Sequence, residues 1–319
     1  MALNKEQILT LSLVKGIGPK KILAIGELAD NISAETSGYE KLYDLMQHMK
    51  EKAIRKVTLS DLSTAYQKAR KLIDESSEHG INFLGYYDEN FPPSMRKALN
   101  EDGKSAPPLY LWYRGDISVL GIPGIAVIGT REPTPEGESA GTYLARQFAK
   151  RGLNIVSGLA VGCDTCGHKG ALEVNGKTTA ILADGLDKES IYPPENKELA
   201  EEIVRKGGLL LSEYGYGERV NRYSLVARDR LQAALANATL VVQTGIKGGT
   251  MHAANTTLVS QKPLYAILYK DEETNKNDKC LGNALLVEKG AKYIKGDDDL
   301  DKISETIKKP RQMKQSLFD

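Results

Sequence analysis

Residues 153–170 read LNIVSGLAVGCDTCGHKG and carry the clearest indication of the fold class. An apolar run with the character of a strand leads into a glycine-rich turn, after which a helix is expected. A strand, a tight turn and a helix in this order form the repeating unit of parallel α/β sheets. The stretch also holds a Cys-x-x-Cys pair, Cys163 and Cys166, with His168 two residues later. It is therefore either a metal or redox site, or a loop whose backbone N–H groups grip phosphate.

The same pattern repeats from residue 124 onward. The apolar runs that indicate buried strands are IAVIG, LNIVSGLA, TTAILADG, LLLSEY, TLVVQTG and PLYAIL. They alternate with runs that indicate helices, EGESAGTYLARQFAKRG, KELAEEIVRKGG, RDRLQAALANA and GTMHAANTTLVSQ. This alternation predicts a Rossmann-like, doubly wound α/β domain with a mostly parallel sheet. Ligands of such sheets bind beyond the carboxyl ends of the strands, so the residues after each strand are the candidates for function.

The chain before this domain is organised differently. Residues 1–76 contain short apolar-periodic runs broken by glycines, which predicts a small helical domain. Within it, LVKGIGPKKILAI places Gly-Ile-Gly between two amphipathic stretches, the form of a helix-hairpin-helix or SAM-like domain. Such a hairpin either presents backbone N–H groups to a phosphate, with Lys15, Lys20 and Lys21 adding charge, or is a tight turn that needs glycine.

Three further segments complete the expected organisation. Residues 77–123 hold paired prolines and clustered aromatics, and we expect an ordered linker that packs on the core. The Rossmann-like domain then covers residues 124–300, and residues 301–319 form a C-terminal tail. From about residue 270 the chain is rich in Lys, Asp and Glu, and we expect a solvated end there instead of a second core.

Composition excludes several classes of protein. The 319 residues are 41% hydrophobic and 27% charged, which is ordinary for a globular protein. No apolar run approaches the length of a membrane span and the start lacks the order of a secretion signal, so we expect a cytoplasmic protein. Lys and Arg total 43 against 42 Asp and Glu, for a net charge of +1. Any site for a polyanion must therefore be built locally.

The turns after the predicted strands supply such a site. They contain glycines, hydroxyls and cations, interleaved with tyrosines that can stack on bases. This combination suits single-stranded nucleic acid, although the same residues could be a solvated set of loops. The candidate binding residues are Gly129, Thr130, Arg131, Ser157, Gly158, Gly162, Asp164, His168, Lys169, Arg219, Arg222, Arg228, Arg230, Lys247, Gly248, Gly249 and Thr250.

No catalytic set stands out in the sequence. There is no Walker loop, and GTREPTPEG replaces the dinucleotide fingerprint at the first helix, which argues against an ATPase or an NAD enzyme. Asp164 and His168 lie four residues apart, hence on one helical face. They form either a catalytic pair, or a helix cap (Asp164) beside a histidine that contacts a phosphate or simply packs. Without a nucleophile or a metal we favour the second interpretation and expect a binding protein with no cofactor.

The two sulfurs are more easily explained by packing than by chemistry. A structural zinc site needs four ligands, and the only candidates besides Cys163 and Cys166 are Cys280, His168 and His252. A redox pair at a helix N-terminus fits the spacing but not the remaining pattern. Cysteine as a small apolar filler beneath a tight loop is the favoured interpretation.

Taken together and in order, six motifs resemble the DprA/Smf family of bacterial DNA-processing proteins. They are VIGTR, SGLAVGCDTCGHKGAL, GLDKESIYPPEN, LLLSEY, ARDRLQAALA and GGTMHAA, and the resemblance extends over nearly the whole chain to about residue 270. It implies an extended Rossmann fold, sequence-independent binding of single-stranded DNA, dimerisation, and loading of the recombinase RecA. It also implies a binding protein, not an enzyme. Matched by position, the family's pocket arginine falls on Arg131, its glycine loop on Ser157 to His168, its arginine pair on Arg228 and Arg230, and its basic loop near Arg219 and Arg222.

The chain departs from the family pattern at informative positions. Val161 stands where the family usually has arginine, which removes a phosphate contact. Asp229 replaces the usual asparagine between the two arginines and places a negative charge near the predicted pocket. These changes bear on DNA affinity and leave open a diverged role, for example in phage biology or defence.

Two other interpretations are carried forward. IKGGTMHAA resembles the glycine loop of LOG-type Rossmann proteins that hydrolyse nucleotides, but the glutamate of that loop is absent, so nucleotide binding is the more plausible form of this alternative. Ser316, Leu317 and Phe318 resemble the end of a peptide that binds the bacterial sliding clamp, although an incidental apolar tip is the favoured interpretation.

Overall fold

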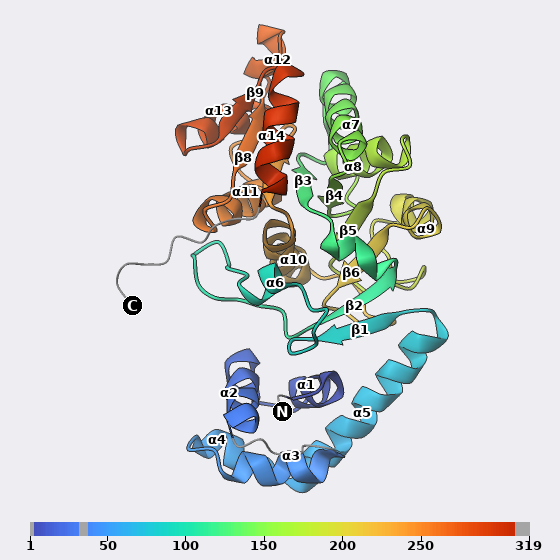
Figure 1. The fold of residues 1–319 in the computed structure, drawn as a ribbon, viewed down its shortest axis with the longest axis vertical. Coiled ribbons are helices and arrows are strands. Elements are labelled where there is room, and N and C mark those ends of the chain that lie inside the picture. Colours follow the sequence, from blue (N-terminus) through green and yellow to red (C-terminus); the bar gives the residue numbers. More distant parts are fainter. Residues whose placement is uncertain (1–2, 32–37, 310–319) are drawn as a thin grey trace.

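The computed structural model describes residues 3–31 and 38–309, and these form a nine-stranded sheet with helices around it (Figure 1). The strand order is β1-β2-β6-β5-β4-β3-β7-β8-β9. The strands from β6 to β9 in this order pair in parallel, whereas β1 and β2 are antiparallel additions at one edge. The strands are β1 (Asn82–Gly85), β2 (Tyr110–Gly115), β3 (Gly124–Ile128), β4 (Asn154–Ser157), β5 (Thr178–Leu182), β6 (Leu209–Ser212), β7 (Ala238–Val241), β8 (Leu264–Ile267) and β9 (Lys292–Ile294).

The path of the chain through the sheet creates a topological switch point between β3 and β7. From β3 the chain passes through β4 and β5 to β6 on one side of β3, and then returns to β7 on the other side. Helix α10 (Arg222–Leu235) makes this return. In open parallel sheets, the crevice outside the strand ends at such a point is where ligands bind.

Helices cover both faces of the sheet. Neighbouring side chains of a strand point to opposite faces, so Ile125 and Val127 of β3 join one buried cluster and Ala126 and Ile128 join another. Helices α7, α8 and α14 pack in the first cluster, and α10, α11 and α13 pack in the second. The predicted α/β, Rossmann-like fold class is confirmed. The helices after β1 are α6 (Pro93–Arg96), α7 (Pro135–Lys150), α8 (Cys163–Leu172), α9 (Lys197–Arg205), α10, α11 (Gly249–Val259), α12 (Glu272–Lys276), α13 (Leu281–Glu288) and α14 (Asp298–Lys308).

The sequence predicts a helix over the regular run RDRLQAALANA, but α10 begins earlier, at Arg222. The side chain of Asn221 accepts hydrogen bonds from the N–H groups of Tyr223 and Ser224, and the Ser224 hydroxyl accepts one from the Asn221 N–H. This capping box satisfies donors that a helix start leaves free. Arg222 and Val226 are therefore part of the helix that crosses the switch point.

The N-terminal part of the chain is helical, as predicted, and lies beside β1 and β2 (Figure 1). The turn between its first two helices holds Gly16 at φ 86°, a left-handed conformation that favours glycine. Lys21 Nζ donates to the Gly16 carbonyl oxygen at 2.8 Å. The helical hairpin is thus present, and its binding to phosphate stays a prediction. The helices are α1 (Lys5–Ser12), α2 (Pro19–Asn31), α3 (Gly38–Gln47), α4 (Lys52–Arg55) and α5 (Leu59–Glu78).

The expectation of a solvated end after residue 270 is wrong. The described residues there add β9 to the sheet and contribute α12, α13 and α14. Leu300, Ile303 and Ile307 of α14 are at most 5% exposed and pack in the core. Their spacing puts them on one helical face while the abundant charges face outward. The boundary predicted at residue 301 falls inside α14, and residues 77–123 likewise enter the sheet through β1 and β2.

Some sequence predictions are not addressed by the described residues. The resemblance of Ser316, Leu317 and Phe318 to a clamp-binding peptide lies outside them. Within residues 3–31 and 38–309, no helix has both the length and the apolar character needed to cross a bilayer.

Candidate functional site

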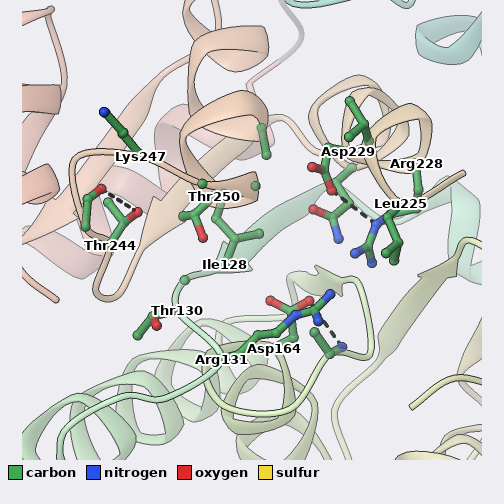
Figure 2. A pocket seen from close by; sticks show the side chains of 18 of the residues that line it. Ile128, Thr130, Arg131, Asp164, Leu225, Arg228, Asp229, Thr244, Lys247 and Thr250 are labelled. Atoms are coloured by element: carbon green, nitrogen blue, oxygen red, sulfur yellow. Dashed lines mark hydrogen bonds and ion pairs between the residues drawn. The ribbon is translucent and has the colours of Figure 1, made fainter. Parts of the chain in front are cut away.

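A pocket of about 540 Å³ opens at the switch point between β3 and β7 (Figure 2). Three segments line most of it: the loop after β3, the loop after β7 with the start of α11, and one face of α10. The pocket therefore lies where open parallel sheets bind their ligands. The predicted residues that line it are Gly129, Thr130, Arg131, Asp164, Arg222, Arg228, Lys247, Gly248, Gly249 and Thr250.

Three cations stand at the rim of this pocket. Arg131, Arg222 and Lys247 are all exposed, and within the described part of the chain neither Arg131 nor Lys247 has an ion-pair partner. The Arg222 guanidinium lies 4.7 Å from the centroid of the Tyr223 ring, which is itself 71% exposed. Unpaired cations beside an exposed ring suit the phosphates and bases of a single strand.

The start of α11 adds backbone donors to the same pocket. Gly248 precedes the helix with a φ of 122°, a conformation that favours glycine. The N–H groups of Gly249 and Thr250 have no acceptor among the described residues. Free N–H groups and the helix dipole together favour a negative charge at a helix N-terminus.

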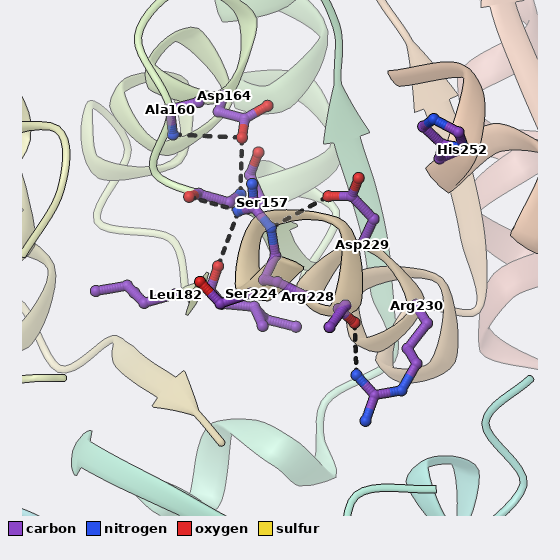
Figure 3. Close-up of polar contacts among 12 residues, drawn as sticks. Ser157, Ala160, Asp164, Leu182, Ser224, Arg228, Asp229, Arg230 and His252 are labelled. Carbon is purple, nitrogen blue, oxygen red and sulfur yellow. Dashed lines mark hydrogen bonds and ion pairs between the residues drawn. The ribbon is translucent and has the colours of Figure 1, made fainter. Parts of the chain in front are cut away.

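The glycine-rich loop after β4 is closed by internal bonds (Figure 3). The N–H groups of Gly158 and Ala160 donate to Asp164 Oδ2 at 3.0 and 3.4 Å. Asp164 is only 6% exposed, and it braces this loop instead of capping α8, whose N-cap is Gly162. Gly158 lies so close to Arg228 that a Cβ there would stand 1.6 Å from Nη1. Two of the donors expected to hold phosphate are thus already used.

The two arginines of the RDR sequence in α10 point in opposite directions (Figure 3). Arg228 reaches beneath the glycine loop, where Nη1 donates to two backbone carbonyl oxygens, of Gly158 and of a β5 residue, at 2.6 and 2.9 Å. Arg230 turns away, donating from Nε to the Ala106 carbonyl oxygen at 2.8 Å and from Nη2 to Glu213 at 2.6 Å. Arg228 therefore braces the pocket, and Arg230 ties α10 to the segment before β2 and to the loop after β6.

Two residues predicted to bind phosphate lie inside the protein. Ser157 and His168 are both 0% exposed. Ser157 Oγ donates to the Val127 carbonyl oxygen at 2.6 Å, and His168 Nδ1 lies 2.7 Å from Thr178 Oγ1. Burial lowers the pKa of His168 to about 3, with a smaller effect from Arg228, so the ring is neutral at pH 7. The predicted ligand contacts of these two residues are wrong, because neither side chain has surface to offer.

Three other predicted residues lie outside the pocket lining. Gly162 has a φ of 81°, and a Cβ there would stand 2.6 Å from backbone atoms of Arg131, so it positions the loop after β3. Lys169 is exposed on α8. Arg219 donates to the carbonyl oxygen of Glu189. The contact with a ligand that the sequence predicts for Lys169 and Arg219 is not tested by these positions. Because Lys169 lies outside the pocket lining, we expect at most a small contribution from it.

The cysteines are buried as free thiols. Cys163 packs against Gly129, where a Cβ would stand 2.5 Å from its Sγ. Burial raises the pKa of both Cys163 and Cys166, which opposes the thiolate that a metal ligand or a redox nucleophile requires. In the part of the chain that the structure describes, no three His, Cys, Asp or Glu residues are grouped to hold a metal. The positions of the sulfurs favour the packing interpretation.

Asp229 is the most unusual polar group of the pocket. It is 9% exposed, and its Oδ1 lies 3.2 Å from Arg228 Nε. Burial raises the pKa of Asp229 to about 6, although the charge of Arg228 opposes the shift. Burial raises the pKa of Asp164 in the same direction. The pocket therefore has cations at its rim and carboxyl groups on its inner wall.

An apolar wall of the pocket and a second cavity were not predicted from the sequence. Leu225 and Val226 line the pocket, and Val226 is 50% exposed although it is aliphatic. A cavity of about 170 Å³ shares Arg131 with the pocket and is lined by Tyr192 and Pro193. The apolar wall could have been found from the adjacent Leu-Val pair before the RDR sequence. Because α10 begins before this pair, both residues belong to the helix face that lines the pocket.

Fold and pocket together define the class of protein: a Rossmann-like α/β protein whose ligand pocket lies at the topological switch point. The model of the family DNA recombination-mediator protein A matches residues 82–306. The chain is 31% identical over 308 residues to protein Smf of Synechocystis, covering 93% of this chain and 72% of the relative. It is 27% identical over 243 residues to DNA processing protein DprA of Bacillus subtilis, covering 76% and 77%. The chain belongs to the DprA/Smf family, and its role is in DNA processing and recombination.

Two solved structures share the fold of this chain. The X-ray structure of DprA from Streptococcus pneumoniae superimposes with a TM-score of 0.75 at 24% identity, covering 95% of this chain and 98% of that one. A DprA structure from Helicobacter pylori has a TM-score of 0.60 at 32% identity, covering 73% and 97%. That second structure concerns the binding of single-stranded DNA by the Helicobacter protein.

Proposed function

We propose that this protein is a recombination mediator that binds single-stranded DNA at the switch-point pocket, protects it and loads a RecA-type recombinase. The supporting observation is the set of exposed cations, Arg131, Arg222 and Lys247, around the free N-terminus of α11. Each can pair with a backbone phosphate without first breaking an ion pair to another described residue. The related Helicobacter protein binds single-stranded DNA, which supports the same ligand here.

The protein acts by binding and not by catalysis in this proposal. The glycine loop, Asp164 and Arg228 form a rigid support that fixes the rim in place. Dimerisation, which the family resemblance implies, would place two such pockets on one strand and raise the apparent affinity through multivalency. Sedimentation of the purified protein, with and without a long oligonucleotide, tests the dimer separately from the pocket.

The binding proposal is tested by fluorescence anisotropy with a labelled single strand across a salt series. We expect affinity to fall with salt, with a log–log slope of about −0.7 for each phosphate neutralised. Arg131→Ala should weaken binding about tenfold and make the slope shallower. Lys150→Ala, an exposed cation at the end of α7, is the matched control and should change little. No binding at low salt, or equal effects of the two variants, contradicts the proposal.

Recombinase loading requires its own experiment. A strand coated with single-strand binding protein should support RecA ATP hydrolysis sooner when this protein is added. Arg131→Ala should lose that stimulation in proportion to its loss of DNA affinity. Stimulation that is absent for the parent protein while its DNA binding is intact would leave a DNA-binding protein without the loading role.

A further inference from the structure

The inner wall of the pocket is chemically unlike its rim. Asp229 projects from α10 into the pocket with 9% of its surface exposed, and Arg228 is the only described residue that pairs with its carboxylate. Oδ2 lies 3.7 Å from the position that a Cβ on Gly249 would occupy, which is ordinary contact distance. Glycine at that position leaves the space beside this oxygen open. One carboxylate oxygen thus faces the pocket without a donor from any residue that the structure describes.

This wall does not suit a phosphate. Asp229 and Asp164 both line the pocket, and an anion placed between them meets like charges at reduced dielectric. The phosphates of a bound strand therefore belong at the rim, with Arg131, Lys247 and the start of α11. What enters the pocket must instead bring hydrogen-bond donors and a surface that suits the aliphatic side chains of α10.

A nucleobase meets both requirements, and guanine meets them best. Its N1–H and exocyclic N2–H lie side by side, so one can donate to the open Oδ2 and the other to the second lone pair of Oδ1, which already contacts Arg228. Adenine and cytosine present one amine beside a ring acceptor, and thymine presents one N–H between two carbonyl oxygens. Leu225 and Val226 provide an apolar surface for the faces of the ring.

We propose that the pocket is a base site in which Asp229 accepts the N1–H and N2–H of one guanine of a single strand, while rim cations hold the flanking phosphates. The inference rests on the proposed function and adds a base preference to it. A free guanine nucleotide presents the same base and phosphate groups, so the site would also accept it. The strand is the favoured source, because the three exposed cations of the lining, Arg131, Arg222 and Lys247, suit more than one phosphate.

The test compares oligothymidines that differ at one central position, measured by anisotropy on the intact protein. A central guanine should bind about tenfold tighter than thymine, in the range of a good bidentate contact. Hypoxanthine, which lacks the N2 amine, should lose most of this gain. Guanine with N7 replaced by carbon should keep it, because the edge facing Asp229 is unchanged. These comparisons use the parent protein, so they do not depend on the folding of a variant.

Two variants separate base recognition from strand binding. Asp229→Asn keeps the size of the side chain and should abolish the preference for guanine while thymine strands bind as well as before or better. Lys247→Ala should weaken guanine and thymine strands equally. A thermal melt of each variant checks its fold.

The outcomes distinguish this inference from the proposed function. Equal affinity for all central bases overturns the base site and leaves strand binding intact, whereas no binding to any strand at low salt overturns both. Free dGMP provides the last comparison. If dGMP competes at concentrations near the dissociation constant of the guanine strand, the strand is not the source of the base and that part of the proposal is overturned; weak competition, at least a hundredfold poorer, supports it.

Discussion

Two glycine-rich turns of this protein are alike in sequence and different in structure. The turn after β4, residues 158–162, is closed by hydrogen bonds to Asp164 and by the buried Arg228. The turn after β7, residues 245–250, is largely exposed, and the N–H groups at the start of α11 have no acceptor among the described residues. Glycine marks both as tight turns. Whether the backbone N–H groups of such a turn remain available to a ligand depends on which acceptors distant segments of the chain place against the turn.

The closed turn should be the more sensitive to a side chain. Gly158→Ala puts a Cβ 1.6 Å from the present position of Arg228 Nη1, so the arginine must leave its buried carbonyl partners. We expect a loss of about 3 kcal/mol of unfolding free energy, measured by urea denaturation.

The matched control is alanine in the open turn. Among the described residues, a Cβ at Gly249 meets only Asp229 Oδ2, at 3.7 Å, and the φ of Gly249 is not in the left-handed region. Gly249→Ala should therefore change stability by less than about 0.5 kcal/mol. Equal losses in the two variants would show that the turns do not differ in the way described.

Beneath the closed turn, His168 should stay neutral well below its usual pKa. Burial lowers that pKa to about 3, so the folded state resists a proton that the unfolded chain accepts near pH 6.5. The stabilising contribution is present above about pH 6.5 and is lost as pH falls, by about 2 kcal/mol at pH 5. An NMR titration of the His168 ring should show no midpoint between pH 8 and 5, and the pH slope of stability should be shallower in His168→Gln. A midpoint above pH 5.5 contradicts the burial.

A lysine from each region tests which turn faces the ligand. Lys247 belongs to the open turn and lines the pocket, whereas Lys169 stands on the helix that follows the closed turn, outside the pocket lining. Lys247→Ala should weaken single-strand binding about five- to tenfold, and Lys169→Ala less than twofold. Anisotropy at one low salt concentration measures both. The reverse order would move the interface to the α8 side.

The smallest expected effect is a pH dependence of base preference. Asp229 is faced by Arg228 on its own helix, Asp164 of α8 and His252 of α11, and burial raises its pKa to about 6. Above that pH the carboxylate accepts the guanine donors, and below it the protonated group cannot accept both. The preference for guanine over thymine should fall from about tenfold at pH 8 to about twofold at pH 5. A preference independent of pH in the parent protein would contradict the role of Asp229.

The fold class could be predicted because the strands of a parallel sheet have a recognisable local sequence pattern. A run such as IAVIG is apolar throughout because both faces of β3 are buried, and the glycine turns and amphipathic helices follow in regular order. The C-terminal error has an equally local cause. Charged residues dominate the composition of α14, and the three apolar residues that hold it become significant only when a sheet face receives them.

The candidate site was only partly predictable for a related reason. Residues that point outward from the strand ends, such as Arg131 and Lys247, could be found by position. The directions of Arg228 and Arg230 could not be predicted. Residues two positions apart on a helix lie on roughly opposite faces, and the sequence does not say which face meets the pocket. The burial of His168 was hidden in the same way.

The order of strands and turns, the family of the protein and the cations at the strand ends can all be recognised from the residue pattern. Which polar groups the fold consumes, and which remain for a ligand, depends on how the helices and strands pack. A hydrogen bond within the protein uses up a donor or acceptor, and its partner usually comes from a distant part of the chain. Asp164 and Asp229 show the difference, because one carboxylate closes a loop and the other keeps an oxygen open to the pocket.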